Sequence, residues 1–158
     1  MANGNNRYEG TTTVTAGELI LGANGAFGQT SLLNIASGAS ANINGYRQTV
    51  GAVTNTGTVT LGNGGELTST DTLINTGMIN VTDGILNLEN GGASSISGGL
   101  TGNGILNIKG GDFTISIDNN GLAGQTNISD GASVTLGNGG PLSEPVIWAA
   151  ALLMCWGI

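Results

Sequence analysis

The residues that could carry out acid–base chemistry are few and mostly acidic. The chain has ten carboxylates, three cations and no histidine. The densest group of ionisable side chains comprises Lys109, Asp112, Asp118 and Asp130. Carboxylates beside a cation can cleave glycosidic bonds, so this group keeps a β-helical polysaccharide lyase or hydrolase as the alternative hypothesis. We favour the interpretation that these carboxylates lie in solvated turns, and we predict no catalytic residue.

Other reactive-site patterns are incomplete. The chain lacks histidine, which is the commonest general base in enzymes. The usual Ser and Cys catalytic triads and His-based zinc sites are therefore excluded. Gly110-Gly111-Asp112 matches only half of one calcium-binding Gly-Gly-x-Gly-x-Asp unit, and such sites need tandem units. Gly22, Gly25 and Gly28 are spaced like a phosphate loop, but no Lys-Ser or Lys-Thr pair follows them. We therefore expect no metal, no cofactor and no enzymatic activity.

Binding to nucleic acid or to ice is also disfavoured. The formal net charge of −7 is the reverse of what phosphate contacts require. Thr54, Thr56, Thr58 and Thr60 occupy alternate positions, so we expect four hydroxyls on one strand face, a pattern that could order water at an ice surface. The following repeat has Met78 and Asn80 where a second threonine row would be needed, so we expect an ordinary solvent-facing stripe.

The elements that must position these residues are predicted to be strands. Gly, Asn, Thr and Ser make up 79 of the 158 residues, and these residue types disfavour helix. Leu, Ile, Val and Phe nevertheless make up a quarter of the chain, which is more than disordered chains contain. Apolar residues alternate in short runs such as Val59 with Leu61 and Leu86 with Leu88, which is typical of half-buried strands.

An internal repeat of about 20 residues indicates how the strands are arranged. Eight Asn-Gly pairs begin at residues 3, 24, 44, 63, 90, 103, 120 and 138. Residues 55–61 recur as 75–81, and residues 84–88 recur as 104–108. A meander of hairpins would need a turn about every 8 to 12 residues, so a coil with two or three strands per turn fits better.

The predicted fold is therefore an all-β, right-handed, single-stranded parallel β-helix of about seven coils. Equivalent residues should stack about 4.8 Å apart. Ile85 should lie on Ile105, Leu86 on Leu106, Asn87 on Asn107 and Leu88 on Ile108. No polar cap is recognisable at either end, so we expect a piece of a longer rod that is marginally stable or prone to aggregate alone.

Two segments resemble a known family motif. Residues 8–19 (YEGTTTVTAGEL) are similar to the passenger-associated repeat of bacterial autotransporters, and residues 123–134 are a looser second copy. The resemblance covers residues 6–140 in general character. It implies a right-handed β-helical passenger of the pertactin-like kind on the surface of a Gram-negative bacterium, where many relatives are adhesins or promote aggregation and biofilm.

The end of the chain differs from the rest. Residues 141–158 contain both prolines, both tryptophans and the single cysteine, Cys155, but no alternation and no Asn-Gly pair. We predict a β-helix over residues 1–140 and a hydrophobic, non-β or disordered tail over residues 141–158. A frame-shifted or truncated gene end explains this tail better than a capping helix or an anchor. The apolar run at residues 146–158 is shorter than the ~17 residues that a membrane-spanning helix needs.

These patterns together predict a structural or binding protein. The expected role is that of a passenger fragment for adhesion or biofilm formation, truncated or derived from a pseudogene. The expected partners are a host glycan, a matrix protein or a second copy of the chain, and neither nucleic acid nor a membrane span is expected. The resemblance places the parent protein at the cell surface, in the outer membrane or outside the cell. The sequence as written resembles neither the export signal nor the outer-membrane β-barrel that this placement requires.

Overall fold

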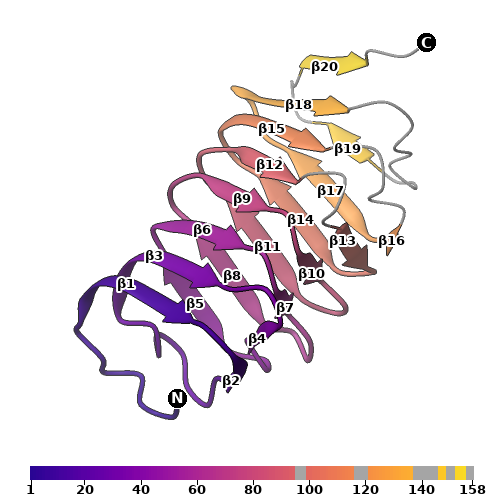
Figure 1. The fold of residues 1–158 in the computed structure, drawn as a ribbon. Coiled ribbons are helices and arrows are strands. Elements are labelled where there is room, and N and C mark those ends of the chain that lie inside the picture. Colours follow the sequence, from indigo (N-terminus) through magenta and orange to yellow (C-terminus); the bar gives the residue numbers. More distant parts are fainter. Residues whose placement is uncertain (95–98, 116–120, 137–145, 149–151, 156–158) are drawn as a thin grey trace.

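The chain winds into a rod of stacked coils, each built from short parallel strands (Figure 1). The computed structural model describes residues 1–94, 99–115, 121–136, 146–148 and 152–155. Its strands form three parallel sheets, here called sheets A, B and C.

Sheet A has eight strands, which in spatial order are β1 (Glu9–Val14), β3 (Gln29–Ile35), β6 (Ala52–Asn55), β9 (Leu73–Asn75), β12 (Gly92–Ser94), β15 (Gly111–Ile115), β18 (Ala132–Leu136) and β20 (Leu152–Cys155). Sheet B has six strands, which are β2 (Gly17–Ile20), β4 (Ala39–Asn42), β7 (Thr58–Thr60), β10 (Met78–Asn80), β13 (Gly99–Gly102) and β16 (Gly121–Leu122). Sheet C also has six strands, which are β5 (Arg47–Val50), β8 (Glu66–Ser69), β11 (Ile85–Leu88), β14 (Ile105–Ile108), β17 (Gln125–Ile128) and β19 (Val146–Trp148).

The predicted parallel β-solenoid is confirmed, with about six turns where about seven were expected. A full coil contributes one strand to each sheet in the order A, B, C. The predicted stacking of β11 on β14 is also confirmed, since Ile85, Leu86, Asn87 and Leu88 pair with the residues 20 positions later. The right-handed sense of winding stays a prediction from the crossover rule.

Strand alternation places one side chain in two inside the rod. Val59, Ile79, Leu86 and Leu106 are fully buried, and the outward residues between inward ones are mostly exposed or half-buried. The interior is mainly aliphatic, with Phe27 and Phe113 as its largest members. It also holds two fully buried amides, Asn55 and Asn75, stacked at the corner between sheets A and B.

The Asn-Gly pairs within the described residues lie at corners or in the terminal segment. They do not all occupy the same corner of the coil. Asn44 and Asn63 lie between sheets B and C, whereas Asn90 lies between sheets C and A. At 44–45 and 63–64 both residues have positive φ, and Tyr46 N–H and Gly65 N–H close the two turns onto Ile43 O and Gly62 O. These are the features of the type I′ turn that Asn-Gly favours.

Glycine has a second role just before the strands of sheet C. Gly84 and Gly104 precede β11 and β14, and both are buried. A Cβ atom at residue 104 would overlap the backbone O atoms of Val81 and Gly84, and one at residue 84 would overlap Leu61 O. Neither glycine has a positive φ, so close approach of successive coils requires them.

The expectation that no polar cap exists is wrong at the N-terminal end. Residues 1–7 are polar for the most part and pack against the turn at residues 21–28, which takes the place of a sheet C strand in the first coil. Gly22 N–H donates to Met1 O at 2.6 Å, and Asn6 Nδ2 donates to Ala26 O at 2.6 Å. The next coil contacts this turn through the buried side chain of Gln48. Gln48 Oε1 accepts a hydrogen bond from Phe27 N–H, and Gln48 Nε2 donates one to Ala23 O.

The C-terminal segment differs from the predicted non-β tail wherever it is described. Val146–Trp148 pair in parallel with Thr126–Ile128 and extend sheet C. Leu152–Cys155 pair with Ser133–Leu136 and extend sheet A. Short apolar runs can add to an open sheet edge through backbone hydrogen bonds, without the Asn-Gly punctuation of the earlier coils. The remaining residues of 141–158 lie outside the described part of the chain.

Candidate functional site

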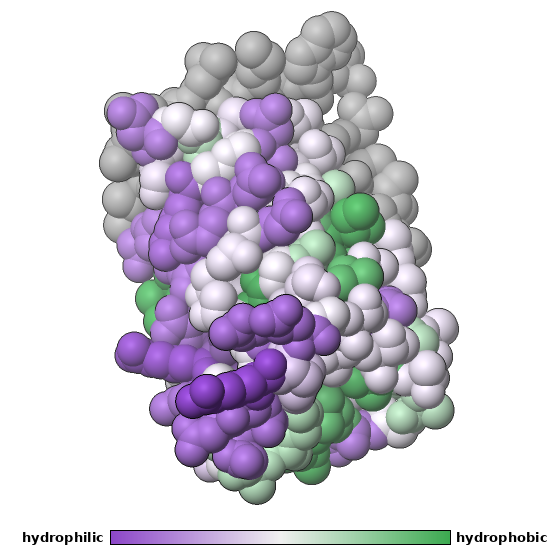
Figure 2. Space-filling model, turned by 90° about the vertical axis from the view of Figure 1, so that its left-hand side faces the viewer, coloured by the Kyte–Doolittle hydropathy of each residue, from purple (hydrophilic) through white to green (hydrophobic). Residues whose placement is uncertain are grey.

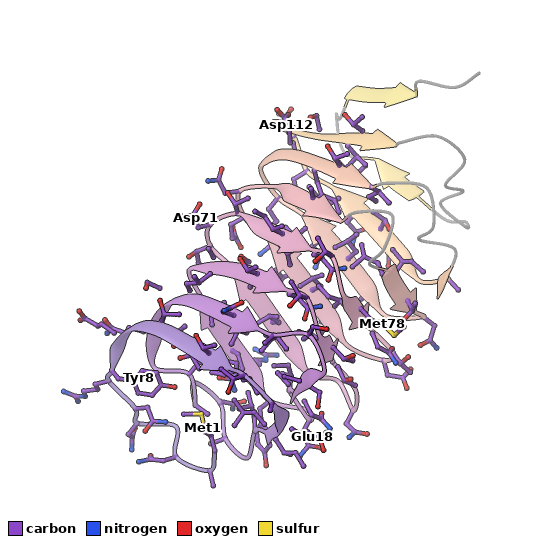
Figure 3. The ribbon with its side chains drawn as sticks, in the orientation of Figure 1. Met1, Tyr8, Glu18, Asp71, Met78 and Asp112 are labelled. Atoms are coloured by element: carbon purple, nitrogen blue, oxygen red, sulfur yellow. The ribbon has the colours of Figure 1, made fainter. Side chains whose placement is uncertain are left out.

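The ionisable residues of the predicted acidic group are dispersed. Lys109 Nζ pairs with Glu89 Oε1 at 2.9 Å, and Asp112 accepts a hydrogen bond from Ser133. Asp130 is exposed in the turn between sheets C and A, whereas Asp118 lies outside the described residues. Figure 3 shows Asp71 and Asp112 projecting outward at separate turns of one edge, with Glu18 on another side of the rod.

Within the described ranges, no three Asp, Glu or Cys side chains come close enough to hold a metal ion. The second cation of the coils, Arg47, pairs with Glu66 at 3.2 Å, and its side chain is 80% exposed. Each cation of the coils thus has one carboxylate partner in the adjacent coil. The carboxylate arrangement that would favour the polysaccharide-cleaving alternative is not formed by Asp112, Asp130 and Lys109.

The four threonines do not share a strand face, so that expectation is wrong. Thr54 lies on β6 in sheet A, whereas Thr58 and Thr60 lie on β7 in sheet B. Thr56 occupies the corner between them, and its hydroxyl donates to Ile35 O at 3.0 Å. The Asn55-Thr56-Gly57 segment bends the chain because Asn55 turns inward and accepts a hydrogen bond from Gly57 N–H.

A ladder of amide side chains runs along the outer face of sheet C. Asn127 Nδ2 donates to Asn107 Oδ1 at 2.7 Å, and Asn107 Nδ2 donates to Asn87 Oδ1 at 2.8 Å. The ladder ends on Thr68 Oγ1 and Glu66 Oε1, which both accept from Asn87 Nδ2. Asn87 is only 3% exposed although it points outward, because its neighbours in the ladder cover it.

A shallow groove lies at the corner between sheets C and A near the N-terminal end. Its volume is about 340 Å³. Exposed side chains of Gln29, Ser31, Thr49 and Thr70 line it, and Gly28 and Gly51 add backbone. None of its lining residues is charged or aromatic. The groove therefore offers hydroxyl, amide and peptide groups, which suit a neutral ligand that forms hydrogen bonds.

An irregularity of strand pairing shapes this groove. Gly10 and Thr11 of β1 pair with Thr30 and Leu32, so Ser31 is an extra residue in β3. Such bulges bend a strand and redirect its side chains. On the other side, a Cβ atom at residue 51 would overlap Ser31 O, so glycine is needed where these coils meet. No local motif in the sequence indicates this groove, because the bulge depends on the register between coils.

The two sheets that meet at this corner have different surfaces. Figure 2 views the side on which sheet C leads into sheet A, and hydrophilic residues gather over one half while hydrophobic residues are more frequent over the other. Sheet C carries the amide ladder and Glu66, which forms an ion pair with Arg47 and accepts a hydrogen bond from Asn87. Sheet A carries Ile74, which is 49% exposed, and the half-buried Leu32 and Ala52.

The fold and the sites define the chain as a parallel β-solenoid with hydrogen-bonding outer faces. Among known proteins it is similar to Uncharacterized lipoprotein YdeK of Escherichia coli K12, with 36% identity over 138 residues, which are 87% of this chain and 9% of YdeK. It is also similar to Uncharacterized protein YuaQ of the same strain, with 34% identity over 109 residues, which are 68% of this chain and 6% of YuaQ. The chain therefore spans less than a tenth of the length of these relatives.

No protein-family profile and no solved structure matches the chain. In the part of the chain that the structure describes, no helix is long and apolar enough to cross a membrane.

Proposed function

We propose that this chain is a rod segment of a larger bacterial envelope protein of the autotransporter-passenger kind, and that its outer surface mediates adhesion. The observation that carries the proposal is the regular stacking of coils, which buries an aliphatic interior and turns a ladder of amide side chains outward on sheet C from Asn87 to Asn127. The similarity to small parts of two large proteins, one of them named a lipoprotein, is consistent with a segment of an envelope rod.

The groove at Gln29, Ser31, Thr49 and Thr70 is the contact site that we propose for a neutral glycan. Sugar hydroxyls both donate and accept hydrogen bonds, as do the hydroxyl and amide groups of this groove. The ion pairs of Arg47 and Lys109 leave little free positive charge on the coils for an anionic ligand.

The full 158-residue chain tests this proposal on a glycan array and a panel of matrix proteins. We expect binding to neutral glycans that is lost in Thr49→Lys, which fills the groove, and kept in Thr60→Lys, which places the same charge on sheet B. Absence of binding by a folded sample would refute the adhesive role. Release of unsaturated or reducing ends from a polysaccharide would instead support the lyase or hydrolase alternative.

A further inference from the structure

The Asn-Gly pairs that form the corners are also sites of intrinsic chemical reactivity. In such a pair, the backbone N atom of Gly can attack Cγ of Asn, because glycine has no Cβ atom to hinder the approach. The N–Cγ bond forms, the Cγ–Nδ2 bond breaks, and ammonia leaves with the proton of the Gly N–H. Water then opens the cyclic imide to give Asp or isoaspartate. Hydrogen bonds and burial decide which pairs can react in a folded chain.

The pair at residues 63–64 is open to this reaction. Asn63 and Gly64 are both exposed, and no atom lies within 4 Å of the position that a Cβ atom of residue 64 would occupy. The turn is closed by the N–H of Gly65, which donates to Gly62 O at 3.0 Å. Within the described ranges, the N–H of Gly64 itself donates to no protein acceptor. Toward the described residues, the Asn63 side chain makes one hydrogen bond, from its Nδ2 to Asn44 Oδ1 at 3.4 Å.

The pair one coil below is a matched comparison. Asn44-Gly45 has positive φ values similar to those of Asn63-Gly64, at 50° and 79° against 58° and 77°. Gly45 N–H, however, donates to Gly62 O at 3.1 Å, so the attacking nitrogen is engaged with the next coil. The Asn44 amide is bonded at both ends, since Nδ2 donates to Leu21 O and Oδ1 accepts from Asn63.

The other pairs in the described coils are restrained by bonding or burial. At residues 24–25, Gly25 N–H donates to Arg47 O and Asn24 Oδ1 accepts from Arg47 N–H. Gly91 and Gly104 are buried, and Asn103 Oδ1 accepts from Asp83 N–H. Asn3-Gly4 is exposed, but it lies in the terminal segment outside the coils.

From these differences, we propose that Asn63-Gly64 is a deamidation site and, among the Asn-Gly pairs of the described coils, reacts before those at 24, 44, 90 and 103. The product carries one more negative charge, and its carboxylate has no N–H to donate to Asn44 Oδ1. The reaction thus alters the corner between two adjacent coils without any enzyme or cofactor.

The test is peptide mapping by mass spectrometry of the full chain, incubated at mildly alkaline pH with and without urea. In the folded chain, the peptide with Asn63 should gain the one-dalton mass increase several times faster than the peptide with Asn44. In urea the two rates should converge, because the hydrogen bonds that separate them are gone. Equal rates in the folded chain, or faster reaction at Asn44, would overturn the proposal.

Two variants separate the chemistry from the fold. Asn63→Gln should abolish the fast conversion while keeping an amide at the corner, because a longer side chain closes the ring poorly. Tyr46→Phe changes a residue beside the Asn44-Gly45 turn and leaves both Asn-Gly pairs intact, so this variant should keep the fast conversion. Circular dichroism before incubation establishes that each sample is folded, and persistence of the fast conversion in folded Asn63→Gln would assign it to another residue.

Discussion

Asparagine has two distinct structural roles in this rod, and burial separates them. Asn55 is fully buried and holds three partners, since its Nδ2 donates to Asn75 Oδ1 and Met78 O and its Oδ1 accepts from Gly57 N–H. Asn107 is half-buried on the outside of sheet C and links Asn87 to Asn127. Water can replace the partners of Asn107 but not those of Asn55, so the two bonding networks differ in energetic weight.

This difference predicts the effect of removing each side chain. Asn55→Ala leaves buried polar groups without partners, each of which costs about 1–3 kcal/mol. Asn107→Ala leaves groups that water can reach and should cost about 1 kcal/mol or less. Urea unfolding followed by circular dichroism should show a clearly lower midpoint for Asn55→Ala than for Asn107→Ala. Equal midpoints would show that the buried amide pair contributes little to stability.

At the scale of the turn, one local sequence can build two different corners. Residues 34–40 (NIASGAS) connect sheet A to sheet B, whereas the similar residues 127–133 (NISDGAS) connect sheet C to sheet A. A backbone hydrogen bond closes each turn: Ala39 N–H donates to Ala36 O in the first, and Ala132 N–H donates to Ser129 O in the second. The glycines of the two turns, Gly38 and Gly131, have positive φ. The local sequence therefore sets the shape of the turn, and the register between coils sets which sheets it joins.

The dependence of each corner on the register between coils separates the features that the sequence predicts from those that it does not. The stacking of Ile85 on Ile105 followed from the repeat, because identical spacing brings equivalent residues together. The inward position of Asn55 and the bulge at Ser31 did not follow, because both depend on contacts with residues one coil away. Asp130 lies in an exposed turn as expected, whereas Asp112 is exposed on strand β15 and not in a turn.

The corner glycines give the prediction that belongs to this scale. Gly104→Ala should disrupt the stack of corners, because its Cβ would overlap backbone O atoms of the coil below. Gly62→Ala is the matched control, since residue 62 has no positive φ and its nearest neighbour would lie at 4.0 Å. Thermal unfolding should show a large loss of stability for Gly104→Ala and little change for Gly62→Ala. Similar melting temperatures would mean that the coils can separate slightly at no cost.

At the scale of the whole molecule, each coil contacts only its neighbours, so stability should depend on complete turns. Deleting residues 86–105 removes one period and joins Ile85 to Leu106, which carries the same inward side chain as Leu86. In the shortened chain, Asn107 takes the place of Asn87 above Thr68. Deleting residues 86–95 removes only half a turn: β12 and all but one residue of β11 are lost, so β10 and β13 of sheet B follow each other without the sheet C and sheet A strands between them.

We expect the one-turn deletion to keep a β-type circular dichroism spectrum and cooperative unfolding at a lower temperature, because fewer apolar residues are buried. The half-turn deletion should lose both properties. If the two deletions behaved alike, the solenoid would not be the unit that stabilises this chain.

The N-terminal segment covers part of one open end of the rod. β1, β2 and β5 are the first strands of their sheets, so their outer edges have backbone groups that no further strand pairs. Residues 1–7 lie over part of this end and bond to Gly22 and Ala26. Exposed edges of parallel sheets can pair with another chain, and covering them is a common protection against association. Removing the cover should therefore promote contact between rods.

Deletion of residues 1–7 tests this role by sedimentation velocity over a range of concentrations. We expect the shortened chain to self-associate at concentrations at which the full chain sediments as a smaller species, because Gly22 N–H loses its acceptor Met1 O and Ala26 O loses the Asn6 donor at the open end. Asn3→Ala is the control, because Asn3 is exposed and its side chain bonds only to Asn5 N–H within the same segment. A deletion variant that sediments like the full chain would show that the first coil needs no cover, and that the twist and short length of its edge strands are enough to prevent pairing.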